Sequence, residues 1–69
     1  MRIQSGYYRH YKGGEYRVLG VGLHTETQEE LVLYTSVADG RLWARPVEMF
    51  FEDVVLEDGA VPRFLWLRE

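Results

Sequence analysis

Sixty-nine residues without a cysteine are enough for one domain, 1–69, and exclude both a disulfide framework and a cysteine-based zinc site. The net charge of −3 does not favour a general nucleic-acid binder, and no apolar run approaches the ~20 residues that span a bilayer. Because the start of the chain lacks a basic and then apolar leader, a cytoplasmic location is predicted. A core this small depends on packing, for which two tryptophans, five tyrosines and three phenylalanines are suited.

The first third of the chain predicts a β-hairpin. Aromatic residues are dense in Tyr7 to Lys12, which is typical of a strand. Gly13-Gly14 then predicts a tight turn, and Glu15 to His24 a second strand. The apolar residues of this second strand change face at Gly20, which indicates a bulge or sharp bend of the kind that closes a small barrel.

The middle of the chain predicts two more strands. Glu30 to Ser36 is apolar on both faces and is therefore predicted to be a central strand. Asp39-Gly40 indicates a turn, after which Arg41 to Arg45 predicts the fourth strand. On this strand Trp43 shares one face with Arg45.

The last third predicts one helical turn and two strands. Pro46 to Phe50 fits a short turn that places Met49 and Phe50 in the core. Glu52 to Leu56 and Val61 to Leu67 predict the fifth and sixth strands. The alternative is a helix from Pro46 to Val54, which has apolar residues at helical spacing.

The order of these motifs resembles one known family along nearly the whole chain, roughly Gly6 to Leu67. The residues that carry the resemblance are Tyr8 to Tyr16, Val18-Leu19-Gly20-Val21, His24-Thr25-Glu26-Thr27, Leu31-Val32, Leu42-Trp43, Arg45-Pro46, Met49-Phe50 and Pro62-Arg63-Phe64. They are similar to the bacterial domain family of unknown function called DUF1653. The resemblance implies an all-β fold, a small SH3-like antiparallel barrel of five to six strands with one short 3₁₀ turn. It implies no activity.

Catalysis has the weakest support in the sequence. There is no cysteine nucleophile, and neither Ser5 nor Ser36 lies in a recognisable nucleophile elbow. A small hydrolase or metal-dependent enzyme would need His10, His24 and Glu26 to converge. The competing interpretation is a hydrogen-bonded corner in which His24 and its neighbours satisfy local amides. We predict no catalytic residue, no metal and no cofactor.

Binding has stronger support, because cations and aromatic rings alternate in Tyr8 to Lys12. Seven of the eight basic residues are arginines, which favour bidentate contact with carboxylate or phosphate. We expect Arg9 and Arg45 to contact an anion, Tyr11 and Trp43 to stack, and His10 to make a pH-sensitive hydrogen bond. The predicted function is a non-catalytic binding module for an anionic or aromatic ligand. A peptide, a nucleotide or a single-stranded nucleic acid fits such a surface, although the net charge does not favour nucleic acid.

Three competing expectations involve the same residues. At least two of Tyr8, Trp43 and Trp66 are expected in the core, and the arginines can pair with the acidic part of the chain. His10 is expected on the outer face of its strand or against a hydroxyl group. A structural domain that forms homo-oligomers through its strand edges is a further alternative, and the sequence leaves the oligomeric state open.

Overall fold

The computed structural model describes residues 3–69, which form seven strands and one helical turn. In chain order these are β1 (Gly6–His10), β2 (Glu15–Leu23), β3 (Glu30–Ser36), β4 (Leu42–Pro46), α1 (Val47–Phe50), β5 (Asp53–Leu56), β6 (Gly59–Pro62) and β7 (Phe64–Arg68). No helix within these residues is long and apolar enough to cross a membrane.

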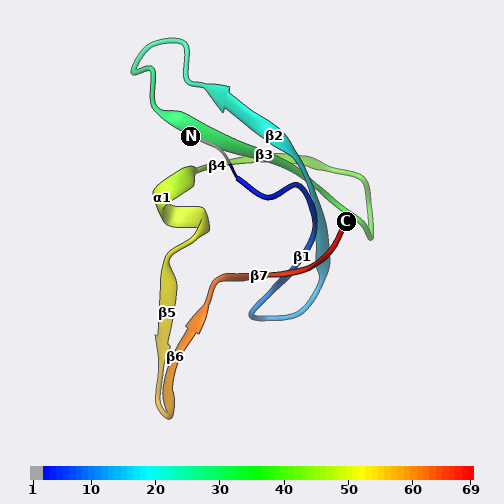
Figure 1. The fold of residues 1–69 in the computed structure, drawn as a ribbon, viewed down its shortest axis with the longest axis vertical. Coiled ribbons are helices and arrows are strands. Elements are labelled where there is room, and N and C mark those ends of the chain that lie inside the picture. The colour runs from blue at the N-terminus through cyan, green and yellow to red at the C-terminus, as the bar shows by residue number, and fades with distance from the viewer. Residues whose placement is uncertain (1–2) are drawn as a thin grey trace.

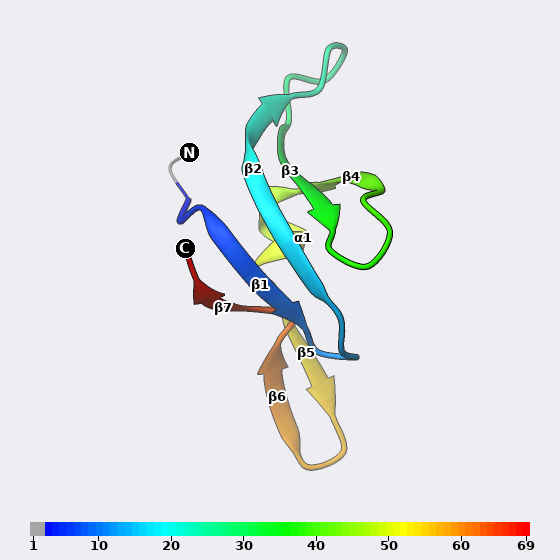
Figure 2. The ribbon, with the colours of Figure 1, turned by 90° about the vertical axis from the view of Figure 1, so that its right-hand side faces the viewer.

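Five antiparallel strands form one curved sheet in the order β4-β3-β2-β1-β7. The strands β5 and β6 form a separate two-stranded hairpin that projects beyond the end of β1 (Figures 1 and 2). The edge strands β4 and β7 do not pair with each other, so the sheet curls without closing. The predicted all-β class is therefore confirmed, whereas hydrogen bonds do not complete the barrel. The predicted central strand, β3, pairs with β2 on one side and with β4 on the other, so it lies in the interior of the sheet as expected.

The predicted bend in β2 is present where the glycine indicated it. Val18 pairs with Tyr34, but the next pair joins Gly20 to Leu33, so Leu19 is an extra residue on β2. Such a bulge increases the local twist of a strand. The bend lets β1 and β4 curve toward the same side of the sheet, which makes that side concave.

The segment after β4 contains only four helical residues. Val54 and Val55 pair with Val61 and Ala60 in the β5–β6 hairpin, so the alternative helix from Pro46 to Val54 is wrong. β-branched side chains favour an extended backbone, which outweighs the helical spacing here. A short helical turn is present as predicted, but Val47–Phe50 forms one α-helical turn and not the expected 3₁₀ turn.

The predicted sixth strand, Val61 to Leu67, is two strands separated by Arg63. The backbone N–H of Arg63 donates to the carbonyl of Glu52 at 3.1 Å, and its carbonyl accepts from Tyr11 N–H at 3.0 Å. The side chain of Arg63 also pairs with the Glu52 carboxylate at 3.2 Å. Arg63 thus fastens the β5–β6 hairpin to the end of β1.

The core lies on the concave side of the sheet, where α1 covers it (Figure 1). Its buried residues are Tyr8, Val18, Val32, Tyr34, Val47, Phe50 and Phe64. The Phe50 ring stacks on Phe64 with the ring centres 4.1 Å apart. Aromatic rings provide much of this core, as the composition predicted.

Two expectations about the core are wrong. Met49, expected inside, is 46% exposed because it points away from the sheet on a turn that buries Val47 and Phe50. Of the three large aromatics, Tyr8 is buried, whereas Trp43 is 44% and Trp66 37% exposed. Trp43 is on an edge strand at the margin of the core, and the Trp66 indole N–H donates to the Ser5 carbonyl at 3.1 Å.

Candidate binding site

A small hollow opens on the concave side of the sheet, with a volume of about 130 Å³. We call it the His10 hollow. Residues from all five strands of the main sheet line it: His10, Tyr16, Tyr34, Trp43, Arg45 and Phe64. Three of the predicted site residues, His10, Trp43 and Arg45, are therefore brought together.

Strand alternation and register explain why these side chains converge. Trp43 pairs with Tyr34 and Arg45 with Val32, and paired residues of neighbouring strands point to the same side of a sheet. Because Tyr34 and Val32 are core residues, Trp43 and Arg45 also face the concave side. They lie on the edge strand, where the core ends, and so remain accessible.

His10 faces the concave side for the same reason, two residues after the buried Tyr8. The expectation that it lies on the outer face is wrong. Its ring centre lies 4.7 Å from that of Tyr11 and 4.9 Å from that of Phe64. The Nδ1 atom accepts a hydrogen bond from the backbone N–H of Lys12 at 3.2 Å. Neutral His10 therefore carries its proton on Nε2, which can donate to an anion.

The electrostatic surroundings of His10 are positive. Burial lowers the pKa of His10 below its ordinary value of 6.5, and the positive charges of Arg45, Arg63 and Lys12 lower this pKa further. Neighbouring cations disfavour another positive charge, and the same cations favour a negative ligand. The hollow is thus suited to an anion before any ligand arrives.

Arg45 is the cation of the hollow that is free to bind. Its Nε–H donates to the Tyr34 hydroxyl at 3.4 Å, and no carboxylate within residues 3–69 forms an ion pair with it. The expected pairing of arginines with acidic residues does occur for Arg63 with Glu52 and for Arg68 with Glu15. Arg45 differs from these two because its terminal nitrogens keep their hydrogen-bonding capacity for a ligand.

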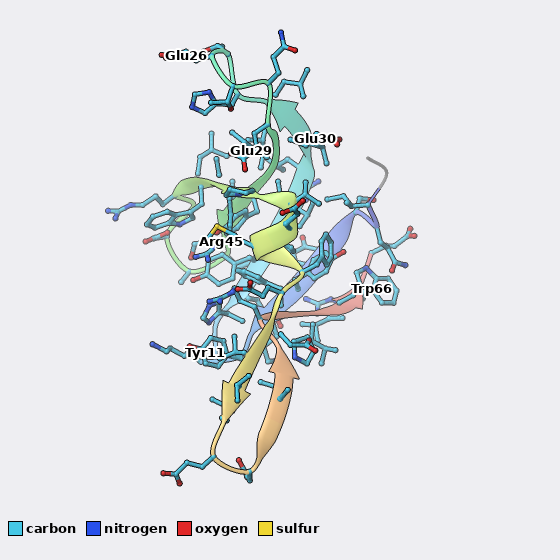
Figure 3. All side chains as sticks on the ribbon, turned by 90° about the vertical axis from the view of Figure 1, so that its left-hand side faces the viewer. Tyr11, Glu26, Glu29, Glu30, Arg45 and Trp66 are labelled. Atoms are coloured by element: carbon cyan, nitrogen blue, oxygen red, sulfur yellow. The ribbon has the colours of Figure 1, made fainter. Side chains whose placement is uncertain are left out.

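The other two predicted residues, Arg9 and Tyr11, lie outside this hollow. They line a neighbouring groove between the β1–β2 turn and the β5–β6 hairpin, and His10 borders both depressions. In Figure 3, Tyr11 lies beside β5, whereas Trp66 lies on the far side of α1. The sequence therefore predicted one surface where the fold has two adjoining ones.

Tyr16, Tyr34 and Phe64 also line the hollow, and they were not among the site residues predicted from the sequence. Tyr16 pairs with the core residue Tyr8, and Phe64 pairs with His10 across β1 and β7. The alternation of β2 could have indicated Tyr16, because it shares a face with Val18. The place of Phe64 depends on the pairing of the two ends of the chain, which no local pattern reveals.

The three residues of the metal alternative do not converge. His24 follows β2 at the end opposite His10, and Glu26 lies in the loop at that far end (Figure 3). The Nδ1 atom of His24 accepts backbone hydrogen bonds from Glu26 at 3.1 Å and Thr27 at 3.3 Å, which is the predicted local corner. Within residues 3–69 no group of three such side chains could hold a metal ion.

Residues 6–66 match the family model described as "Protein of unknown function (DUF1653)". The chain belongs to the DUF1653 family. Among solved structures, the crystal structure of a protein belonging to DUF1653 from Bordetella bronchiseptica is similar, with 34% identity and a TM-score of 0.86. The similarity covers 94% of this chain and 87% of that one. No curated protein matches. The resemblance seen in the sequence is thus confirmed, and the DUF1653 family assigns no activity.

The lowered pKa of His10 predicts that acidification destabilises this DUF1653 domain. Well above pH 6.5, His10 is neutral in both the folded and unfolded states and contributes no pH dependence. As the pH falls below 6.5, the unfolded chain binds the proton first, so stability is lost until the pH passes the lower pKa of the folded state. Urea unfolding at about pH 7.5 and about pH 5.5 measures this loss, and His10→Gln should reduce it. Equal pH dependence in both proteins would show that His10 is not responsible.

Proposed function

We propose that this DUF1653 domain is a non-catalytic binding domain whose ligand places an anionic group in the His10 hollow. The proposal depends on one observation above all. An arginine without a carboxylate partner in the described chain, an exposed tryptophan and a free histidine nitrogen border the same concave hollow: Arg45, Trp43 and His10.

The size of the hollow limits what can enter it. Its volume of about 130 Å³ is roughly four times the ~30 Å³ that one water molecule occupies in the liquid. This is less than the ~300–1,000 Å³ of sites that enclose a drug-sized ligand. A carboxylate or phosphate group with part of an aromatic ring fits, and the rest of a larger ligand would extend outside.

Each lining group has a matching role in binding. The guanidinium of Arg45 can hold two oxygens of a carboxylate or phosphate, and Nε2–H of His10 can donate to a third acceptor. The indole of Trp43 offers a flat face for a ring. The ligand classes are a peptide or a nucleotide, and the net charge of −3 disfavours single-stranded nucleic acid. The cytoplasmic location indicated by the sequence remains a prediction.

Benzoate tests the proposal because it combines a carboxylate with one ring. In two-dimensional NMR spectra of the ¹⁵N-labelled domain, benzoate should shift the Trp43 indole and Arg45 Nε–H signals together. Benzamide has the same shape without the charge and should shift them much less. Binding should also tighten as the pH falls toward the pKa of His10, since an anion favours the protonated imidazole. Equal shifts with benzamide, or shifts confined to other strands, would contradict the proposed anion site.

A further inference from the structure

A larger depression adjoins the His10 hollow, and the proposed function does not explain it. This depression, which we call the Leu65 groove, has a volume of about 520 Å³. It lies between the β1–β2 turn and the β5–β6 hairpin. Its lining residues are Arg9, His10, Tyr11, Lys12, Gly13, Leu56, Val61, Pro62 and Leu65. Its volume falls within the range of ~300–1,000 Å³ that is typical of ligand sites.

The groove combines an apolar floor with a cationic rim. Leu56, Val61 and Leu65 provide aliphatic surface, and Leu65 is 52% exposed although it belongs to a strand of the main sheet. Arg9 and Lys12 stand at the rim, both exposed and without an ion pair to any carboxylate of residues 3–69. No acidic residue lines the groove. The lining therefore complements an apolar group that carries negative charge beside it.

The hairpin that forms one wall has no further strand partner within residues 3–69. The strands β5 and β6 pair only with each other, and none of their residues belongs to the buried core of the described chain. An isolated two-stranded hairpin is marginally stable in water. Here Arg63 fixes the base of the hairpin through Glu52 and Tyr11, so the wall is held against the β1–β2 turn. Leu56 on this wall is 40% exposed, and Val61 is half-buried.

We infer that the Leu65 groove binds a short acidic peptide segment of a partner protein, with one aliphatic or aromatic side chain on the apolar floor. A neighbouring aspartate or glutamate of the peptide then meets Arg9 or Lys12. The charges at the tip of the hairpin, Glu57 and Asp58, repel a polyanion that passes the groove. This repulsion disfavours nucleic acid, because its phosphates repeat along the whole strand. It also places the acidic residue of the peptide on the side of the groove formed by the β1–β2 turn.

Selection from a random decapeptide library displayed on phage tests this inference with the intact domain as bait. The expected peptides carry an aspartate or glutamate two or three residues from a leucine, isoleucine or phenylalanine, since alternate side chains of an extended segment share one face. Fluorescence anisotropy of one selected, labelled peptide then gives its Kd. Leu65→Ser and Arg9→Gln should each weaken binding about tenfold.

Matched control variants separate this site from a general surface effect. Leu19 is also 52% exposed and lies on β2 outside the groove, so Leu19→Ser should change Kd less than twofold. Arg17 is an exposed arginine on β2, and Arg17→Gln should likewise change Kd less than twofold. Circular dichroism of each variant confirms that it is folded.

Several results would overturn the inference. One is a selection without acidic and apolar enrichment, and another is tighter binding to a labelled oligothymidylate than to the peptide. A dimer in sedimentation that Leu65→Ser abolishes would assign the groove to a second copy of the chain. Loss of peptide binding in Arg45→Gln but not in Leu65→Ser would place the peptide in the His10 hollow, so the proposed function would stand and this inference would fall. If benzoate does not bind but the selected peptide binds as expected, the proposed anion site in the His10 hollow would fall and the inference about the Leu65 groove would stand.

Discussion

Phe50→Ala should lower the free energy of unfolding by about 3–5 kcal/mol, the usual cost of removing a buried phenylalanine. Phe50 is fully buried, and its ring contacts Phe64 at 4.1 Å and both Tyr8 and Tyr34 at 5.3 Å between ring centres. A domain of 69 residues has a total stability of about 3–10 kcal/mol. The variant should therefore be largely unfolded near body temperature, which circular dichroism during urea or thermal unfolding measures.

The next residue in the chain provides the control. Phe51 is 43% exposed, and its ring lies at the margin of the same cluster, 6.2 Å from Tyr8. Phe51→Ala should cost about 1 kcal/mol, since much of its ring is already in contact with water. If Phe51→Ala destabilises the domain as much as Phe50→Ala does, the conclusion that the core is centred on the stacked rings of Phe50 and Phe64 is wrong.

Arg45→Gln should weaken benzoate binding about 10–100-fold. Hydrogen bonds to charged groups contribute about 1.5–3 kcal/mol, and each 1.4 kcal/mol is a factor of ten in Kd. Glutamine retains most of the length of the side chain, and the Arg45 hydrogen bond to the Tyr34 hydroxyl is long, at 3.4 Å, so the fold should persist. The dependence of NMR shifts on benzoate concentration gives Kd for both proteins.

Arg17→Gln is the matched control for this prediction. It removes the same charge from an exposed position on β2, and Arg17 does not line the His10 hollow. If the loss of affinity comes only from the change in net charge, Arg45→Gln and Arg17→Gln should weaken benzoate binding equally. In that case high salt should also bring the Kd of both variants to that of the wild type. An unchanged Kd in Arg45→Gln would refute the assignment of Arg45 to the anion.

The local parts of the fold were predictable from the sequence. Glu30–Ser36 is a strand with the expected bounds, and Gly13 and Gly14 have the positive φ angles, +99° and +86°, that a tight glycine turn favours. The bulge beside Gly20 and the single helical turn after Pro46 also follow from short-range rules. In each case the determining physics acts within a few residues.

Long-range pairing explains most of what was not predicted. The segment from Val61 to Leu67 is apolar apart from Arg63 and contains no turn signal, yet the chain changes its partner at Arg63, from β5 to β1. That change depends on Glu52 and Tyr11, which are distant in sequence. The incomplete closure of the barrel likewise depends on the distance between two edge strands, which no local pattern specifies.

In the candidate site, too, local features were predictable from the sequence and long-range pairing was not. Alternation predicts that Trp43 and Arg45 share a face, but only the pairing with Tyr34 and Val32 shows that this face is the concave one. The pattern in Tyr8 to Lys12 placed Arg9, His10 and Tyr11 together, although strand alternation separates Arg9 from its neighbour. Residues from one short segment thus serve two depressions, and His10 is common to both.

The most direct test of the proposed anion site is a set of isotope-filtered nuclear Overhauser spectra of the labelled domain with benzoate. Protons of the benzoate ring should give cross-peaks to both the Trp43 indole and the His10 imidazole, because these two side chains border the same hollow. Cross-peaks to neither residue, with contacts instead to residues outside the His10 hollow, would contradict the account.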